Sequence, residues 1–287
     1  MRDWREDVGR YLLQEVRDEI CALNARETAE AREVRLRANK QAMIRLQTGS
    51  RSLCKMTNAQ IKDCASAMLG HALHARGREL REGFVTLPGG HRAGLCGRAA
   101  AGEGLVEIAS VCIRIAREIY GAADALLPLL LNGNKARSTL LLSPPGRGKT
   151  TVLRDAVRQV SNLGLQIGLA DERSELAACE HGVPQLDVGE NTDVMDGCTK
   201  AHALHALLRG MSPDVLAADE IGGEEDARAI EQAMRCGVSV FATAHGEDYQ
   251  DAIERLPFVR RFERIVVLKG MGEVQCVYDG TGRRLEK

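Results

Sequence analysis

Aromatic side chains are scarce in this chain of 287 residues, which holds one Trp, four Tyr and four Phe, or 3% of the total. Proteins that bind single-stranded nucleic acid commonly stack its bases on aromatic rings. Before residue 120 only Trp4, Tyr11 and Phe84 could serve. The formal net charge of −1 also creates no overall field that attracts nucleic acid or anionic lipid. The few aromatic residues and the near-neutral charge both count against a nucleic-acid-binding protein.

The chain also lacks a long apolar run. Its longest apolar segment, residues 122–131, is interrupted by Asp124 and Pro128 and is much too short to cross a bilayer. The first nineteen residues are rich in charge and lack the apolar core of a secretory signal. These absences predict a cytoplasmic protein whose contact with a membrane is peripheral.

The nine cysteines are scattered, odd in number and without a C-x-x-C pair, which is typical of reduced thiols in a cytosol. Cys54, Cys64, His71 and His74 could be drawn as a zinc site, but their spacing is not that of the usual fingers or ribbons. The alternative is an ordinary helix. With 44% hydrophobic and 28% charged residues, the chain is expected to form one or two globular domains.

One segment carries most of the functional information. Residues 138–142 are predicted to form a buried strand, and a helical pattern begins after residue 150. Between them two glycines let backbone N–H groups turn around an anion, a lysine reaches the terminal phosphates, and a threonine hydroxyl can ligate Mg²⁺. Ser143 stands where the first glycine of G-x-x-x-x-G-K-[ST] is usual. The predicted ATP-binding residues are Pro145, Gly146, Arg147, Gly148, Lys149, Thr150 and Thr151.

A second apolar segment, residues 214–218, ends in two carboxylates. Asp219 is predicted to hold Mg²⁺ together with Thr150, and Glu220 to polarise the water that attacks the γ-phosphate. The competing interpretation makes this pair an acidic cap for a helix over residues 223–234. Glu220 favours hydrolysis over binding alone. A kinase would use its carboxylate near an acceptor-substrate pocket, and the sequence does not indicate such a pocket.

Two further strand ends carry polar residues. Asp171 and Glu172 end a strand-like segment, and either supplies a second polarising group or helps to cap a following helix. His245 ends the apolar segment 241–244. Because the ends of parallel strands collect at the ligand edge of a sheet, we favour a role for His245 in sensing the nucleotide state over a structural role.

Residues 1–120 predict a small α+β domain. Apolar residues at three- and four-residue steps predict one helix over 4–23 and a second over 61–73. Alternating patterns predict a hairpin of strands 33–38 and 43–46, and three more strands at 83–87, 91–97 and 105–115. The domain boundary is expected near Tyr120-Gly121.

Residues 121–287 alternate strands with helices, which predicts an α/β parallel sheet with helices on both faces. A helix over 122–131 leads into it. The expected strands are 138–142, 165–170, 214–219, 237–243 and 264–269. A hairpin of 264–268 and 274–278, around Gly270 and Gly272, is expected at the edge of the sheet.

These motifs together carry a resemblance. Residues 141–269 contain SPPGRGKTT, ADERSELA, TDVMDG, MSPDVLAADEIG and ATAHG, and the first half contains LPGGHRAGLCG and IRIAREI. Over nearly its whole length the chain resembles the stage III sporulation protein AA family of endospore-forming bacteria. That family is similar to the ATPases of type II, type IV and pilus secretion machines, which are RecA-like motors with an extra N-terminal domain.

The resemblance implies a RecA-like P-loop NTPase sheet over 121–287, preceded by an α+β assembly and docking domain over 1–120. It implies an ATPase that uses ATP and Mg²⁺, forms a homo-oligomer, usually a hexamer, and contacts a membrane channel complex peripherally. The expected location is the cytoplasmic, mother-cell side of the forespore membrane, and the expected role is service to the channel between the two cells.

The resemblance also implies residue roles. It assigns Lys149 and Thr150 to the phosphate loop, Asp219 and Glu220 to the Walker B pair, Asp171 and Glu172 to a carboxylate box, and His245 to a histidine box. Three arginines are candidates for acting on a neighbouring subunit's phosphate: Arg209, Arg114 and Arg117. The chain has Glu190-Asn191 where the family more often has Pro-Arg, so no arginine stands at that point.

A competing class is a RecA-like, nucleic-acid-dependent ATPase. Its N-terminal domain would bind a strand through Arg35, Arg37, Lys40 and Arg45. The near-neutral charge and the few aromatic residues favour the secretion motor, so nucleic acid is not the expected partner. A scaffold with an inactive site conflicts with the intact Lys149, Asp219 and Glu220.

Overall fold

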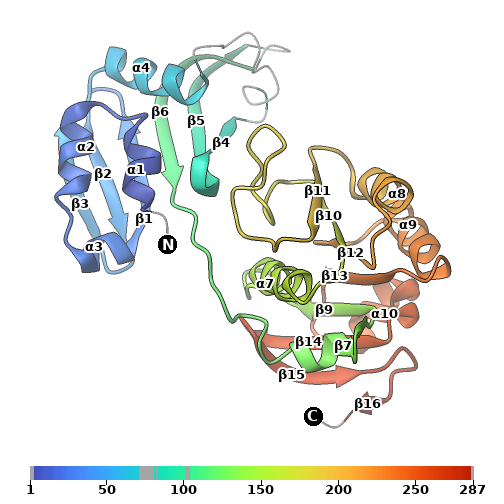
Figure 1. Cartoon of the computed structure of the whole chain (residues 1–287). Helices are drawn as coiled ribbons and strands as arrows, with labels where there is room; N and C mark the ends of the chain where they lie inside the picture. The colour runs from blue at the N-terminus through green and yellow to red at the C-terminus, as the bar shows by residue number, and fades with distance from the viewer. Residues whose placement is uncertain (1–2, 71–80, 82, 101–103, 286–287) are drawn as a thin grey trace. The chain divides into compact units, whose positions relative to one another are not determined.

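The computed structural model describes residues 3–70, 81, 83–100 and 104–285. It divides between Arg117 and Glu118 into two compact units, here called unit 1 and unit 2 (Figure 1). The sequence had suggested a boundary near Tyr120-Gly121.

Unit 1 is a six-stranded antiparallel sheet with helices. Its strands lie in the order β3-β2-β1-β6-β5-β4. The elements are α1 (Trp4–Gly9), α2 (Gln14–Cys21), α3 (Ala25–Glu30), β1 (Ala31–Arg37), β2 (Gln41–Leu46), β3 (Ser50–Lys55), α4 (Asn58–Met68), β4 (Phe84–Leu87), a 3₁₀ turn (Pro88–Gly90), β5 (His91–Ala100) and β6 (Gly104–Arg114). Val34 and Leu36 of β1 point into a core that they share with apolar residues of α1, α2 and α4.

The prediction of a single helix over 4–23 is wrong. The chain leaves α1 after Gly9 through a tight turn, in which the N–H groups of Tyr11 and Leu12 donate to Val8 and Gly9 carbonyls. α2 then begins after Leu13. Trp4 and Val8 of α1, Leu12 of the turn, and Val16 and Ile20 of α2 are all buried, so the three- and four-residue steps continue across the break and conceal it.

Two elements of unit 1 had no sequence signal. α3 buries no residue and is held by a capping box between Asn24 and Glu27. β3 buries only Leu53, so it lacks an alternating pattern. The predicted second helix is present as α4 up to Met68, and Leu73 lies outside the described residues.

Unit 2 is an eight-stranded sheet in the order β11-β10-β12-β13-β9-β14-β15-β16. The first six are parallel, and β15 and β16 are added antiparallel. The elements are α6 (Leu127–Leu130), β7 (Leu131–Asn132), β8 (Lys135–Ala136), β9 (Thr139–Ser143), α7 (Lys149–Asn162), β10 (Ile167–Asp171), β11 (Thr192–Asp196), α8 (Lys200–Gly210), β12 (Val215–Ala218), α9 (Glu224–Arg235), β13 (Ser239–His245), α10 (Tyr249–Arg255), a 3₁₀ turn (Pro257–Arg261), β14 (Arg264–Gly270), β15 (Glu273–Tyr278) and β16 (Arg284–Leu285).

The parallel sheet of unit 2 is covered on both faces, which explains its continuous apolar runs. Helix α7 covers one face, and α8, α9 and α10 cover the other (Figure 1). Leu141 of β9 packs with α7, whereas Leu140 and Leu142 pack with residues of α8, α9 and α10. The predicted class, an α/β parallel sheet preceded by a small α+β domain, is confirmed.

The predicted strands of unit 2 are all present, but three details differ. β11 was missed because none of its five residues is fully buried. The predicted helix over 122–131 is reduced to Leu127–Leu130, because Pro128 lies in its first turn and the chain is extended from Leu131. The predicted hairpin of β14 and β15 is present, but it is not the edge, since β16 pairs beyond it.

Candidate nucleotide site

The phosphate loop connects the end of β9 to the first turn of α7. Gly146 and Gly148 have φ of 75° and 84°, a left-handed conformation that glycine adopts without strain. A Cβ atom at Gly148 would lie 3.0 Å from Cβ of Met271, whereas one at Gly146 would meet open space. The first N–H groups of α7 have no acceptor within the helix, so they are available to an anion at the loop.

Lys149 is a buried cation held by neutral groups. Lys149 is only 5% exposed, and its Nζ donates to the carbonyls of Ser143 (2.8 Å) and Pro144 (3.2 Å). Nζ also lies 3.1 Å from Nδ1 of His245. Within the described part of the chain no carboxylate forms an ion pair with it. Burial lowers the pKa of Lys149, against the opposing field of Asp219 and Glu220. An anion at the loop would relieve this cost.

Asp219 and Glu220 follow the end of β12 and lie beside the loop. Thr150 Oγ1 donates to Asp219 Oδ2 at 2.5 Å, and Thr243 Oγ1 contacts Asp219 Oδ1. Neither carboxylate caps the next helix, because the N-cap position of α9 is occupied by Gly223, and Asp226 accepts the N–H groups of Gly222 and Gly223. The capping interpretation of this pair is therefore wrong.

The Glu220 carboxylate is engaged on both oxygens. Oε1 lies 3.2 Å from Nε2 of His245, and Oε2 accepts from Arg173 at 3.0 Å. Because the Lys149 ammonium can only donate, Nδ1 of His245 must accept, and Nε2 carries the hydrogen that faces Glu220. His245 thus links the loop lysine to Glu220 in one line of polar contacts.

Asp171 and Glu172 have different surroundings. Asp171 is buried and accepts the N–H groups of Glu175, Leu176 and Ala177, so it fastens the loop after β10. Burial raises the pKa of Asp171, and these backbone donors oppose the rise. Residues 172–179 contain no helix, so the predicted helix cap does not form.

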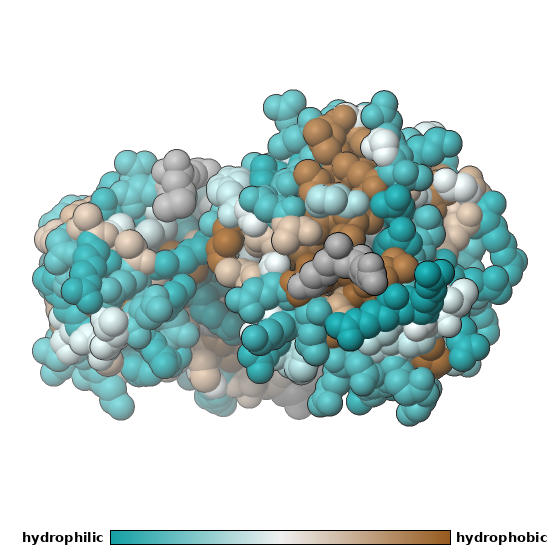
Figure 2. Space-filling model, turned by 90° about the horizontal axis from the view of Figure 1, so that it is seen from below, coloured by the Kyte–Doolittle hydropathy of each residue, from teal (hydrophilic) through white to brown (hydrophobic). Residues whose placement is uncertain are grey.

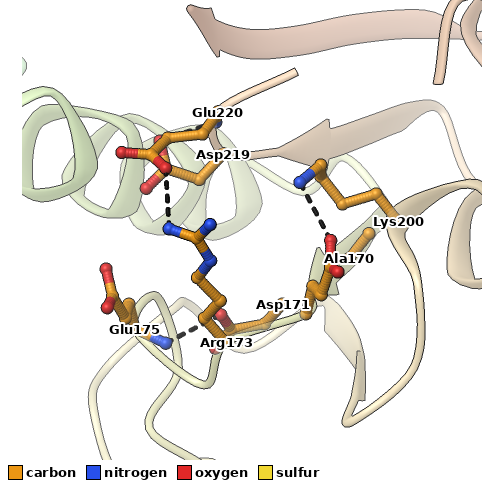
Figure 3. A pocket seen from close by; sticks show the side chains of 8 residues that line it. Ala170, Asp171, Arg173, Glu175, Lys200, Asp219 and Glu220 are labelled. Carbon is orange, nitrogen blue, oxygen red and sulfur yellow. Dashed lines mark hydrogen bonds and ion pairs between the residues drawn. The ribbon is translucent and has the colours of Figure 1, made fainter. Parts of the chain in front are cut away.

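Glu172 pairs with Lys200 at 2.9 Å, and this hydrogen bond lowers the pKa of Glu172. Glu172, Lys200, Asp219 and Glu220 line one small hollow, into which Arg173 reaches from the loop after β10 (Figure 3). Glu172 therefore lies near the Walker B pair, but its partner is a lysine from the start of α8.

The residues predicted to bind phosphate and metal come together at one edge of the sheet. Pro145, Gly146 and Arg147 are exposed on the loop, and Thr151 is half-buried in the first turn of α7. A hydroxyl and a carboxylate, from Thr150 and Asp219, are the hard oxygen ligands that Mg²⁺ accepts alongside phosphate oxygens and water. The donor set therefore fits Mg²⁺ with ATP.

The three candidate arginines belong to different parts of the chain. Arg209 is exposed at the C-terminal end of α8, just before β12 begins. The start of β12 lies at the amino ends of the parallel strands, whereas the phosphate loop follows the carboxyl end of β9. Arg114 is exposed at the end of β6, and Arg117 donates to the carbonyl of Ala31 at 2.6 Å. Arg114 and Arg117 belong to unit 1. Arg209 does not reach the loop of its own chain.

Three residues of the site were missed from the sequence. The Thr243 hydroxyl contacts the Asp219 carboxylate and the Glu220 N–H. Arg173 pairs with Glu220, and Lys200 pairs with Glu172. Thr243 had a signal, because it lies two residues before His245 and so shares a face of the strand with it. Arg173 and Lys200 stood in charged or polar runs with no pattern that indicated their partners.

The basic residues of the alternative class lie partly together. Arg35 and Arg37 are on the face of β1 opposite its buried residues, and Arg45 of β2 pairs across from Glu33. Lys40 is in the turn between β1 and β2. The guanidinium of Arg92 covers the ring of Phe84 at 3.5 Å, so this ring is not open to a base.

Two other expectations concern metals and membranes. In the described ranges no group of three or more His, Cys, Asp or Glu could hold a metal ion, while His71 and His74 lie outside those ranges. None of the helices that the structure describes is long and apolar enough to span a membrane.

The fold is that of the secretion and pilus ATPases. The ATPase DotB of Legionella pneumophila has a TM-score of 0.58 at 14% identity, covering 96% of this chain and 80% of DotB. The pilus retraction motor PilT, solved with bound ADP, has a TM-score of 0.64 at 16% identity, covering 93% of this chain and 81% of PilT.

Within that class the chain belongs to the family "Sporulation stage III, protein AA", which it matches over residues 2–285. It is 36% identical to the stage III sporulation protein AA of Bacillus subtilis over 299 residues, or 98% of this chain and 97% of that protein. The resemblance drawn from the motifs is thus confirmed. The chain is also 30% identical to the type II secretion system protein HxcR of Pseudomonas aeruginosa over 189 residues, but this covers only 37% of HxcR.

Proposed function

We propose that this protein is an Mg²⁺-dependent ATPase that powers or assembles a secretion-like channel between mother cell and forespore. The observation that carries the proposal is the buried Lys149 ammonium, which has only neutral acceptors and lies at the glycine loop beside Thr150 and Asp219. Family membership supports the sporulation setting. The names of the relatives support a secretion-type motor.

The phosphate loop supplies binding. Backbone N–H groups at the start of α7 and the Lys149 ammonium would hold the β- and γ-phosphates, while Thr150 and Asp219 would hold Mg²⁺. The bound metal supplies positive charge that offsets charge on the phosphates. To bind phosphate, Lys149 exchanges its present carbonyl partners for phosphate oxygens.

Glu220 is the proposed general base or water-orienting residue. Its carboxylate lies next to the metal-binding Asp219 and in contact with His245. Glu172 is the weaker candidate, because its carboxylate is occupied by Lys200. His245 contacts both Lys149 and Glu220. When nucleotide binding changes the partners of Lys149, a shift of the His245 side chain would therefore move or reorient Glu220.

The site needs a further cation, because charge develops on the transferring phosphoryl group and arginine commonly supplies the compensation. Arg209 lies at the end of α8 that leads into the start of β12, away from the loop of its own unit, and action of Arg209, Arg114 or Arg117 on a neighbouring subunit would supply this cation. We therefore propose a homo-oligomeric ring, a hexamer as in the related motors, attached peripherally to a membrane channel complex on the cytoplasmic, mother-cell side of the forespore membrane.

A nucleic-acid-dependent ATPase is the second candidate. One observation favours it: Arg35 and Arg37 line the face of the unit 1 sheet that is turned away from its core, where Arg92 and Arg114 pair across β5 and β6. These guanidinium groups could meet anionic groups, but Glu33 lies on the same face and pairs with Arg35 at 2.7 Å. The shielded Phe84 ring and the chain's few other aromatics weigh against base stacking.

The test that separates these candidates is phosphate release from ATP by the full chain. We expect release with Mg²⁺, loss of release with excess EDTA, and no response to single-stranded DNA or RNA. Stimulation of several-fold by a single strand, lost at high salt, would favour the nucleic-acid motor instead. No release under any of these conditions would contradict both.

A further inference from the structure

The Thr243 hydroxyl joins the two carboxylate residues of the proposed site. Thr243 is fully buried in β13, and its Oγ1 accepts the backbone N–H of Glu220 at 2.8 Å and contacts Asp219 Oδ1. Because an ionised carboxylate only accepts hydrogen bonds, the hydroxyl donates its one hydrogen to Asp219. Its lone pairs then receive the Glu220 amide. One side chain from the neighbouring strand thus bonds to both groups, and the Glu220 N–H has a second, longer contact with Asp219 Oδ1 at 3.2 Å.

The backbone at Glu220 requires such support. Glu220 has φ of 51°, a left-handed conformation that is unfavourable for a residue with a Cβ atom. Two bonds from Thr243 hold it there, since the Thr243 carbonyl also accepts the N–H of Ile221 at 2.8 Å. In this conformation the Glu220 carboxylate lies 3.2 Å from His245, at the end of the same strand that carries Thr243.

The carbonyl bond and the hydroxyl bond have separable roles. The Ile221 bond uses only the backbone of Thr243, so it survives any substitution of the side chain. The hydroxyl bond to the Glu220 amide does not. Removing the hydroxyl therefore leaves the Glu220 N–H with only its longer contact to Asp219 Oδ1 at 3.2 Å, while the strand pairing of β12 and β13 stays intact.

We propose that Thr243 is a positioning residue for ATP hydrolysis, whose hydroxyl fixes the direction of Glu220. The inference rests on the proposed ATPase function and adds a residue that acts through the base rather than on the substrate. Loss of the hydroxyl should therefore slow the chemical step and leave nucleotide binding largely unchanged.

The test compares Thr243→Val, which keeps the shape without the hydroxyl, with Thr243→Ser, which keeps the hydroxyl. Both are made in the full chain and assayed for kcat and KM with saturating Mg²⁺. We expect Thr243→Val to lower kcat at least about tenfold with KM changed less than about threefold, and Thr243→Ser to retain most of kcat. If Thr243→Val does not fold, Thr243→Cys, a weak hydrogen bonder, replaces it in the comparison with Thr243→Ser.

A double-mutant cycle shows whether Thr243 acts through Glu220. In a Glu220→Gln background we expect Thr243→Val to cause no further loss. An equal loss in both backgrounds, or a loss that is restored when Mg²⁺ is raised above the concentration that saturates the wild type, would assign the hydroxyl to Asp219 and overturn the inference. Unchanged kcat in Thr243→Val, with an active wild type, overturns this inference alone. An inactive wild type overturns the proposed function and the inference together.

Discussion

At the residue scale, the surroundings of Glu220 and Glu172 distinguish two carboxylates that look equivalent in the sequence. Each ends a strand-like segment next to an aspartate. Glu172 is paired with Lys200, which is only 13% exposed, whereas the partner of Glu220, Arg173, is 67% exposed. An exposed arginine is held weakly and exchanges readily with solvent. Glu220 is therefore the carboxylate that can be released to a water molecule.

This difference predicts the outcome of two matched substitutions. Glu220→Gln should lower kcat by about a hundredfold or more and leave Mg-ATP affinity near that of the wild type, because the amide fills the space but cannot take up a proton. Glu172→Gln is the control and should keep most of the turnover. Single-turnover assays with fluorescent ATP measure both properties. Normal hydrolysis by Glu220→Gln, with loss in Glu172→Gln, would reverse the two roles.

The residues of the site were not equally predictable. Lys149, Thr150 and Asp219 follow from local motifs, whose spacing is set by a strand, a turn and a helix that are adjacent in the chain. The partnership of Thr243 with Glu220 depends on the register between β12 and β13, and that of Arg173 on the path of a loop. Such contacts between distant segments have no local sequence pattern.

At the element scale, the unit of strand β9, phosphate loop and helix α7 depends on two left-handed glycines. Gly146 and Gly148 have similar φ values, but only Gly148 lies against another side chain, that of Met271 in the turn between β14 and β15. The two positions therefore separate backbone strain from steric contact.

The matched pair Gly146→Ala and Gly148→Ala tests this. Each alanine bears the left-handed strain of about 1–2 kcal/mol, and Gly148→Ala adds a Cβ atom 3.0 Å from Met271. We expect both to weaken ATP binding, and Gly148→Ala to weaken it more, with a lower melting temperature. Fluorescent-nucleotide titration and thermal unfolding provide the measurements. An equal effect at both positions would show that the contact with Met271 is unimportant.

Elements of unit 2 were predicted well because its central strands are buried on both faces and read as unbroken apolar runs. The elements that the sequence missed share a cause, which is weak burial. β11 and α3 have no fully buried residue. The false single helix in unit 1 arose because two short helices bury residues at compatible spacings, and a turn of four residues leaves that pattern unbroken.

At the scale of the whole molecule, charge and hydropathy are divided between the two units. Lys and Arg outnumber Asp and Glu in residues 1–117, and the reverse holds in residues 118–287. Apolar side chains gather on the face of unit 2 drawn in Figure 2, where unit 1 is mostly hydrophilic. The two units thus carry net charges of opposite sign, which supports the proposed assembly of copies into a ring.

Assembly should appear in the kinetics. Turnover per chain is expected to rise with protein concentration and to fall at high salt, because a neighbour's arginine contributes about a thousandfold or more in related phosphoryl-transfer enzymes. Mixtures of Lys149→Ala with an alanine variant of Arg209, Arg114 or Arg117, each inactive alone, should recover partial activity for the true donor. Turnover per chain that is flat with concentration, with no complementing pair, would rule out the shared site.

The most direct measurement is the rate of phosphate release by Lys149→Ala beside the wild type, at a concentration where the wild type is active and with folding of both verified by circular dichroism. We expect no detectable release by Lys149→Ala and weakened ATP binding, because the substitution removes the buried ammonium that faces the phosphate loop. Near-wild-type release by Lys149→Ala would contradict the assignment of the nucleotide site.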